Sequence, residues 1–127
     1  MTNQPIPSST LYHQLGGYDV IAAFIDETYK MLRNDPRFSR FSTRSIDSQK
    51  RARQLLVDQI CQLAGGPCLY IGRDMKTAHA GLRITAAEWE ISIEYTQQAM
   101  KNQGIGEREM TEVIAIFEQY RTDIVEA

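Results

Sequence analysis

The apolar residues of this chain recur at helical spacing in every long segment. Spacings of three and four residues place apolar side chains on one face of an α-helix, whereas a half-buried strand alternates with period two. No segment alternates in that way over more than a few residues. We therefore predict an all-α fold. The clearest stripes are Val20, Phe24, Ile25, Tyr29 and Leu32; Ala52, Leu55, Leu56, Ile60 and Leu63; and Met110, Val113, Ile114, Phe117, Tyr120 and Ile124.

Capping residues, glycines and prolines divide the chain into five or six helices. Residues 1–8 are polar and contain two prolines, which predicts a disordered lead-in to one domain at residues 9–127. The predicted helices run from Ser9 or Thr10 to Leu15; from after Gly17 to Asn34; from Asp47 or Ser48 to Gly65; over 74–82; from the Thr85 capping box to Gly104; and from Glu107 onward, with a turn through Phe38 and Phe41.

Charge and cysteine content exclude several classes of protein. The chain has 14 Lys and Arg against 16 Asp and Glu, without a polybasic run, so we expect neither a nucleic-acid nor a membrane partner. No signal peptide or membrane-spanning segment is evident, which favours a cytoplasmic protein, and a monomer is the expected state. The spacing of Cys61 and Cys68 fits neither a disulfide framework nor a zinc site, so both are expected to be free thiols in a reducing compartment.

The chain contains only two histidines. His13 lies near the N-terminus, and we expect it on the surface. His79 shares a helical face with Met75 and Leu82, where it is either a hydrogen-bonded core residue or a ligand. One histidine without a neighbouring Cys, Asp or Glu cluster cannot build a tetrahedral zinc site, but a haem needs only one protein ligand. The sequence has no nucleophile elbow, phosphate loop or spaced carboxylate pair.

The order of the motifs resembles the truncated haemoglobins, over residues 10 to 126. The segment LYHQLGG at 11–17 is similar to the opening of that family, and Tyr29 lies where the family has its helix-B tyrosine. The segment GGPCLYIGRDMKTAH at 65–79 resembles the second glycine motif and the proximal histidine. Ile84-Thr85 and Trp89 are similar to the entry into the fifth long helix in group I. The resemblance implies two helices stacked on two others around a b-type haem (iron protoporphyrin IX).

The resemblance also implies roles for individual residues. His79 would bind the iron through Nε2, while its other ring nitrogen donates a proton to a backbone carbonyl of its own helix. Tyr29, otherwise a core aromatic, would donate a hydrogen bond to bound dioxygen. Phe41 would pack on the porphyrin, and Arg73 or Lys76 would pair with the propionates or remain solvated. The remaining implied pocket residues are Leu55, Leu56, Tyr70, Met75, Leu82 and Trp89.

The register of the distal helix has two alternatives. Counting back from the second glycine pair places Ala52, Leu55 and Leu56 toward the ligand. Counting forward from Tyr29 places there instead a polar set, consisting of Lys50, Arg53 and Gln54. We favour the first register because it also gives the apolar stripe. No histidine lies on this helix, so coordination by two histidines is not expected, and the resting iron is five-coordinate or takes a lysine or tyrosine.

The implied function is reversible binding of dioxygen, carbon monoxide and nitric oxide, as in an oxygen carrier. An enzymatic alternative is oxidation of nitric oxide to nitrate, which requires a separate reductase because the chain has no flavin or nicotinamide domain. Gas sensing through a partner protein is a further alternative. A haem-free helical adaptor is disfavoured, since His79 and Tyr29 are both retained.

Overall fold

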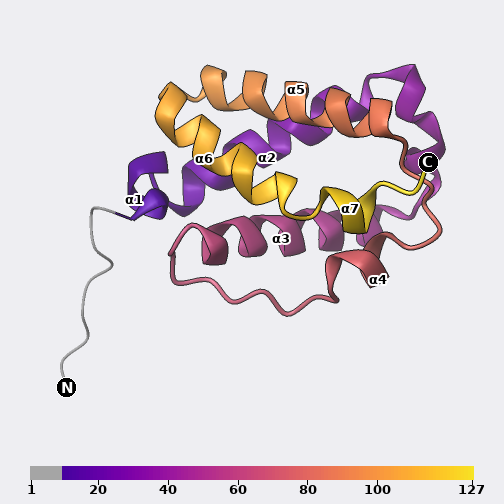
Figure 1. Cartoon of the computed structure of the whole chain (residues 1–127), viewed down its shortest axis with the longest axis horizontal. Helices are drawn as coiled ribbons and strands as arrows, with labels where there is room; N and C mark the ends of the chain where they lie inside the picture. Colours follow the sequence, from indigo (N-terminus) through magenta and orange to yellow (C-terminus); the bar gives the residue numbers. More distant parts are fainter. Residues whose placement is uncertain (1–9) are drawn as a thin grey trace.

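The computed structural model describes residues 10–127, which form eight helical elements and no strand (Figure 1). The predicted lead-in at residues 1–8 lies outside this range, as does Ser9. The elements are α1 Leu11–Leu15, α2 Tyr18–Arg33, the 3-10 helix η1 Pro36–Thr43, α3 Ile46–Leu63, α4 Met75–His79, α5 Ala86–Asn102, α6 Glu107–Glu118 and α7 Arg121–Ile124. The prediction of an all-α fold is confirmed. None of the helices described here has the length and apolar character needed to cross a membrane.

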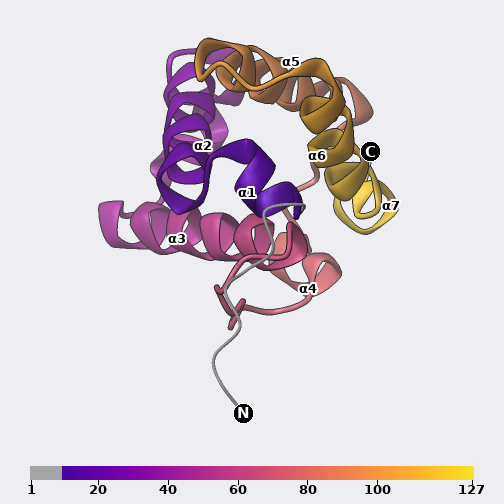
Figure 2. The ribbon, with the colours of Figure 1, turned by 90° about the vertical axis from the view of Figure 1, so that its left-hand side faces the viewer.

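The four long helices α2, α3, α5 and α6 surround a common core, with α1 across one end (Figure 2). α2 packs against α3 and α5, and α6 packs against α3 and α5. The side chains of Ile21, Phe24, Val57 and Val113 are fully buried where these helices meet. Burial of an aliphatic or aromatic side chain of this size contributes about 1.5–3 kcal/mol, so this core holds the helices in place.

Two glycines permit the sharp turns on which this arrangement depends. Gly16 ends α1 with φ of 106°, a conformation that residues with a Cβ rarely adopt. A Cβ at this position would lie only 2.7 Å from Cγ2 of Val20. At the end of α3, a Cβ on Gly66 would collide with the ring of Tyr12. The glycines therefore allow α1 to pack closely against the start of α2 and the end of α3.

Three predicted helix boundaries differ from the structure. α3 begins at Ile46, because Ser45 provides the N-cap by accepting a hydrogen bond from the backbone N–H of Ser48 (3.1 Å). α4 ends at His79 and not at 82, because a turn with Gly81 at φ of 84° follows it. The last predicted helix is two helices, since the chain breaks between α6 and α7 at Tyr120.

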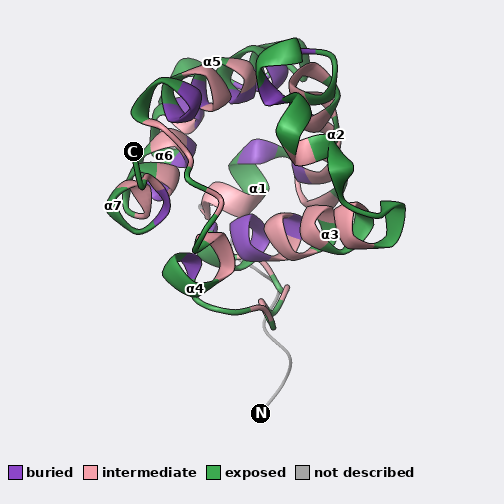
Figure 3. Cartoon of the chain, turned by 90° about the vertical axis from the view of Figure 1, so that its right-hand side faces the viewer, coloured by how far each residue is buried: buried purple, intermediate pink, exposed green. Residues whose placement is uncertain are grey.

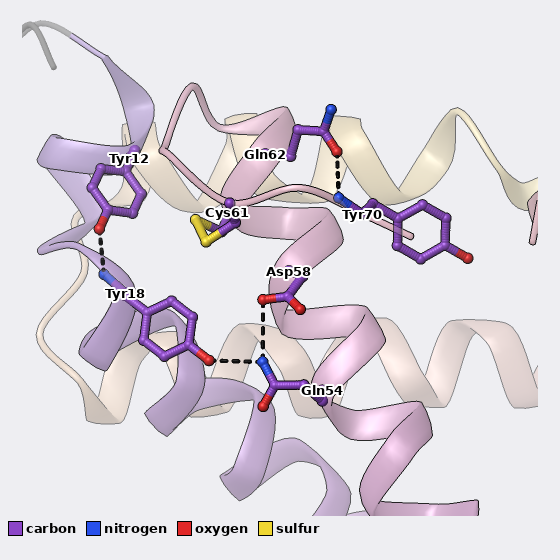
Figure 4. The surroundings of a disulfide bond; sticks show 8 residues. Tyr12, Tyr18, Gln54, Asp58, Cys61, Gln62 and Tyr70 are labelled. Atoms are coloured by element: carbon purple, nitrogen blue, oxygen red, sulfur yellow. Dashed lines mark hydrogen bonds between the residues drawn. A yellow bond between two sulfur atoms is a disulfide. The ribbon is translucent and has the colours of Figure 1, made fainter. Parts of the chain in front are cut away.

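Cys61 and Cys68 form a disulfide, so the prediction of two free thiols is wrong (Figure 4). The turn after α3 reverses the chain and brings the two Cα atoms to 5.7 Å from each other. The backbone N–H of Tyr70 donates to Oε1 of Gln62 (2.8 Å), which fastens the same segment to α3 a second time. A spacing of seven residues in the sequence does not reveal such a chain reversal. The inference of a reducing compartment rested on free thiols and therefore loses its basis.

Candidate functional site

A cavity of about 1270 Å³ lies between the long helices and α4. It exceeds the range of about 300–1,000 Å³ that is usual for pockets that hold small ligands. The helices that line it form a ring in Figure 3, with α2 and α4 on opposite sides. Most of the predicted pocket residues line this cavity, namely Tyr29, Phe41, Leu55, Leu56, Tyr70, Arg73, Met75, His79, Leu82 and Trp89. The fold thus brings together residues that are up to 60 positions apart in the sequence.

Two residues singled out from the sequence lie elsewhere. Lys76 is exposed and is not part of the cavity wall, because it lies on the outer face of α4. His13 is exposed on α1, as expected, with its ring edge-on to that of Tyr12. His79 is therefore the only histidine at the cavity within residues 10–127.

The imidazole of His79 is oriented by its own helix. Its Nδ1 lies 2.9 Å from the backbone oxygen of Met75, one turn earlier. A carbonyl oxygen can only accept a hydrogen bond, so Nδ1 carries the proton and Nε2 of the neutral ring keeps a free lone pair. His79 is half-buried and lines the cavity. This arrangement presents Nε2 as a ligand atom for a metal in the cavity.

Contacts at both of its ends hold α4 in place. Asp74 caps the helix by accepting a hydrogen bond from the backbone N–H of Thr77 (3.2 Å). Met75 is buried against Trp89 and Ile124, which belong to α5 and α7. After the helix, the backbone N–H groups of Gly81 and Arg83 donate to the carboxylate of Glu126 (3.2 and 2.8 Å). The C-terminal segment thus fixes the position of the helix that carries His79.

Tyr29 belongs to α2 and lines the cavity. Figure 3 shows α2 on the opposite side of the ring of helices from α4. Burial raises the pKa of its hydroxyl above the ordinary value, and the nearby positive charge of Arg44 offsets only part of this effect. The hydroxyl makes no hydrogen bond with any group in the described part of the chain. Tyr29 lines the cavity and is half-buried, so its protonated hydroxyl, which has no protein partner, is a hydrogen-bond donor available to a ligand there.

Gln59 is a cavity residue that sequence analysis missed. It is only 8% exposed and lies on α3, where its side-chain amide has no hydrogen-bond partner within residues 10–127. By contrast, the two buried threonines of the cavity, Thr28 and Thr96, donate to carbonyls of their own helices (both 2.8 Å). The signal in the sequence is a glutamine one turn after Leu55, inside an otherwise apolar stripe.

The two sets of α3 residues that the alternative registers place toward the ligand differ in their hydrogen bonds. Arg53 is paired with Asp26 of α2 (2.7 Å), and Gln54 donates to the hydroxyl of Tyr18 (2.8 Å, Figure 4). Both side chains are therefore occupied at the α2–α3 contact. The first set, Ala52, Leu55 and Leu56, is half-buried along the cavity and has no polar side-chain atom. The α3 side of the cavity therefore combines these apolar side chains with the amide of Gln59.

Phe41 is held by the neighbouring Arg40. The guanidinium carbon lies 4.1 Å from the centroid of the Phe41 ring. The same guanidinium donates to the carboxylate of Glu88, and to the backbone oxygens of Leu82 (3.3 Å) and Arg83 (3.1 Å). Arg40 thus connects η1, the turn after α4 and the start of α5, and it keeps the aromatic ring at the edge of the cavity.

The residues present fit a haem better than a metal ion alone. No group of three or more His, Cys, Asp or Glu in the described residues could hold an isolated ion. The cavity instead offers one imidazole with a free Nε2, aromatic and aliphatic side chains, and several exposed cations, Arg73 among them. This donor set suits a macrocycle that supplies its own four nitrogens and carries carboxylates on one side.

Comparison with known proteins gives one consistent result. The family model described as "Bacterial-like globin" matches residues 10–126. The group 1 truncated hemoglobin GlbN of Nostoc sp. is 31% identical over 97 residues, which cover 76% of this chain and 80% of the relative. The group 1 truncated hemoglobin of Tetrahymena pyriformis is 28% identical over 116 residues, which cover 91% and 94% of the two chains.

A solved structure shows the same arrangement of helices. The crystal structure of truncated hemoglobin from Tetrahymena pyriformis in its Fe(III) form superimposes with a TM-score of 0.83 at 27% identity. The match covers 94% of this chain and 100% of that one. The expected stacking of two helices on two others is therefore confirmed.

Proposed function

We propose that this chain, which belongs to the bacterial-like globin family and is a group 1 truncated haemoglobin, holds haem b through His79 and reversibly binds dioxygen and other diatomic gases. The observation that carries this proposal is the contact between His79 Nδ1 and the Met75 carbonyl, which leaves Nε2 free toward the cavity. When bound, a haem supplies an iron with an open coordination position for a gas. The protein supplies the fifth ligand and the surroundings of the sixth position.

Tyr29 is the proposed donor to the gas ligand. Dioxygen gains partial negative charge on a ferrous haem, whereas carbon monoxide gains much less, so a fixed donor favours dioxygen. The hydroxyl of Tyr29 needs no rearrangement to act as this donor, because no group of the described chain forms a hydrogen bond with it. Ala52, Leu55 and Leu56 offer no donor, whereas the side-chain amide of Gln59, which has no partner within residues 10–127, would be a second donor beside Tyr29.

The other cavity residues would hold the porphyrin. Phe41, Tyr70, Met75, Leu82 and Trp89 provide its apolar surroundings. Burial of a large flat macrocycle against such walls removes apolar surface from water, which stabilises the complex. Arg73 at the edge of the cavity would pair with a propionate, whereas the position of Lys76 gives that residue no such role.

We expect His79 to be the single protein ligand that the described residues would offer to an iron in the cavity. The face of α3 along the cavity presents no histidine, and its nearest lysine, Lys50, is exposed to solvent near the mouth. Tyr29 is the remaining candidate for a sixth ligand, but burial raises the pKa of its hydroxyl and so disfavours the anionic form that binds ferric iron.

Oxidation of nitric oxide to nitrate by bound dioxygen is the second candidate function. It leaves the iron ferric, so each turnover needs one electron from a separate reductase. Arg33, Arg44, Lys50, Arg51 and Arg73 line the cavity, are exposed and form no ion pair within residues 10–127. These cations favour this candidate, because such a surface can recruit an electron donor.

Titration of the apoprotein with hemin tests the proposal. We expect one haem per chain and, after reduction under carbon monoxide, the absorption spectrum of a carbonyl complex with histidine opposite the gas. Mixing the reduced protein with dioxygen should then give a stable complex that releases the gas on dilution. Failure to take up stoichiometric haem would refute the proposal, and rapid oxidation in place of reversible binding would leave only the enzymatic candidate.

A further inference from the structure

Five cationic side chains surround the mouth of the cavity. Arg33 ends α2, Arg44 precedes α3, Lys50 and Arg51 lie in the first turns of α3, and Arg73 precedes α4. All five are exposed, and none forms an ion pair within residues 10–127. η1, the start of α3 and α4 lie at the same end of the molecule (Figure 1). We refer to these five residues as the cationic rim.

The rim concentrates positive charge in a protein whose net charge is −2. Residues 30–53 contain eight of the 14 Lys and Arg, but only Asp35 and Asp47 of the 16 Asp and Glu. The only acidic residue that lines the cavity is Asp26, which is already paired with Arg53. Clustering of one sign of charge around a cleft with low-dielectric walls focuses the electric field at its mouth.

A bound haem would neutralise only part of this charge. It carries two propionates, which pair with at most two of the five cations. Roughly three positive charges then remain around the edge through which electrons would enter the haem. Haem binding alone does not account for the surplus of positive charge, because one cation is enough to pair with each propionate.

We propose that the cationic rim docks an acidic one-electron carrier protein of the ferredoxin or flavodoxin type, which reduces the ferric iron. The proposal rests on haem binding by His79. In this step the carrier loses one electron, the ferric iron gains it and becomes ferrous, and no covalent bond forms or breaks. The partner's acidic face would lie against Arg44, Lys50, Arg51 and Arg73 at the exposed edge of the haem.

The charge of the rim favours this partner over others. Electron-transfer complexes bury less than about 1,200 Å² and rely on electrostatic steering more than on apolar contact. An exposed rim of four arginines and one lysine around an open cavity suits such a brief encounter. A second copy of this chain is the main competitor, since residues 86–127 contain nine acidic residues against three Lys and Arg.

The test measures reduction of the ferric holoprotein by a reduced plant-type ferredoxin, under carbon monoxide, which traps the ferrous form. The rim variant is Arg44→Glu/Arg51→Glu. The control is Arg108→Glu, which reverses one charge at an exposed cation of α6 outside the cavity wall. Photoreduced riboflavin, a small neutral flavin, serves as the reference reductant. Calorimetric titration of the ferric protein with oxidised ferredoxin measures docking independently of electron transfer.

We expect the rim variant to react with ferredoxin at least about 10-fold more slowly than the wild type at an ionic strength of about 0.01 M. The difference should vanish near 1 M salt, and binding of oxidised ferredoxin should weaken in parallel. Arg108→Glu should behave as the wild type, and all three proteins should react equally with riboflavin.

Equal rates for the rim variant and the wild type with ferredoxin would overturn the proposal. A second result would also overturn it: salt-dependent self-association that is lost in the rim variant, while ferredoxin binding is unchanged. The rim would then dock a second copy of this chain. Unchanged absorption spectra of each holoprotein show that haem binding is intact, so a failure of the docking proposal is separate from a failure of haem binding.

Discussion

Arg40 of η1 and Glu88 of α5 form a bidentate ion pair, in which both Nη atoms of the guanidinium donate to the carboxylate. The pair joins η1 to the start of α5, beside the turn that follows His79. Glu88 is buried, and its hydrogen bonds with Arg40 hold the pKa of its carboxyl below the usual range. The same carboxylate accepts a hydrogen bond from the backbone N–H of Thr85 (2.9 Å), which completes the capping box of α5. The pair therefore couples the start of α5 to the position of Phe41.

Removal of one partner of this pair should harm the protein more than removal of both. We expect Arg40→Met to lower the melting temperature, because it leaves the charge of Glu88 buried and unpaired. The double variant Arg40→Met/Glu88→Gln should recover part of the loss, since no uncompensated charge remains. Thermal unfolding followed by circular dichroism measures both. A double variant that is less stable than Arg40→Met would contradict this explanation.

Asp35 should make stability depend on pH in the acid range. Its carboxylate accepts hydrogen bonds from Arg37 (2.9 Å) and from the hydroxyl of Tyr95 (2.6 Å), and these hold its pKa far below the ordinary 3.8. A carboxyl whose pKa is lower in the folded state contributes its full stabilisation above 3.8 and loses it as the pH falls toward the folded pKa. Asp35→Asn should therefore be less stable than the wild type in urea at neutral pH.

The difference between Asp35→Asn and the wild type should shrink as the pH falls below about 4. A constant difference across that range would show that Asp35 acts only through packing and not through its charge.

The disulfide should stabilise the segment that leads to α4. Cross-linking of residues seven positions apart removes conformational entropy from the unfolded chain, a stabilisation of about 2–3 kcal/mol for so small a loop. Cys61→Ser/Cys68→Ser, or reduction of the wild type, should lower the free energy of unfolding by about that amount. Urea unfolding with and without a thiol reductant checks this. A reductant effect that persists in the double serine variant would point to another cause.

Sequence patterns predicted the long helices well and the connections less well. The apolar stripes of α2, α3 and α6 follow from the spacing of residues along the chain, and the Thr85 capping box spans only four residues. Both features can therefore be predicted without knowledge of the tertiary structure. The disulfide between Cys61 and Cys68 depends on a chain reversal, which is a property of the folded turn.

The residues of the cavity were likewise predictable only in part. The order of motifs around Tyr29 and His79 identified the residues on the two sides of the cavity, and the structure brings them there. Gln59 escaped notice because a polar residue in an apolar stripe is indistinguishable from a solvated one until its burial is known. Of the two cations considered for the propionates, Arg73 lines the cavity, whereas Lys76 is exposed on α4, as its solvated alternative expects.

Tyr29 gives the most specific prediction for gas binding. Tyr29→Phe keeps the ring and removes the only hydroxyl of α2 that lines the cavity without a protein partner. Loss of one hydrogen bond of about 1.4 kcal/mol to dioxygen should speed its dissociation roughly 10-fold. The dissociation of carbon monoxide should change much less. Stopped-flow displacement of each gas provides the rates, and an unchanged rate for dioxygen would exclude Tyr29 as the donor.

The most direct test of the account is the absorption spectrum of His79→Gly, with and without added imidazole. If His79 is the iron ligand, this variant should lose haem readily to apomyoglobin, and free imidazole should restore both haem retention and the spectrum of the wild-type carbonyl complex. Imidazole can enter because the glycine leaves the space of the side chain open beside the cavity. Retention of haem with an unaltered spectrum in His79→Gly without imidazole would contradict the assignment of His79.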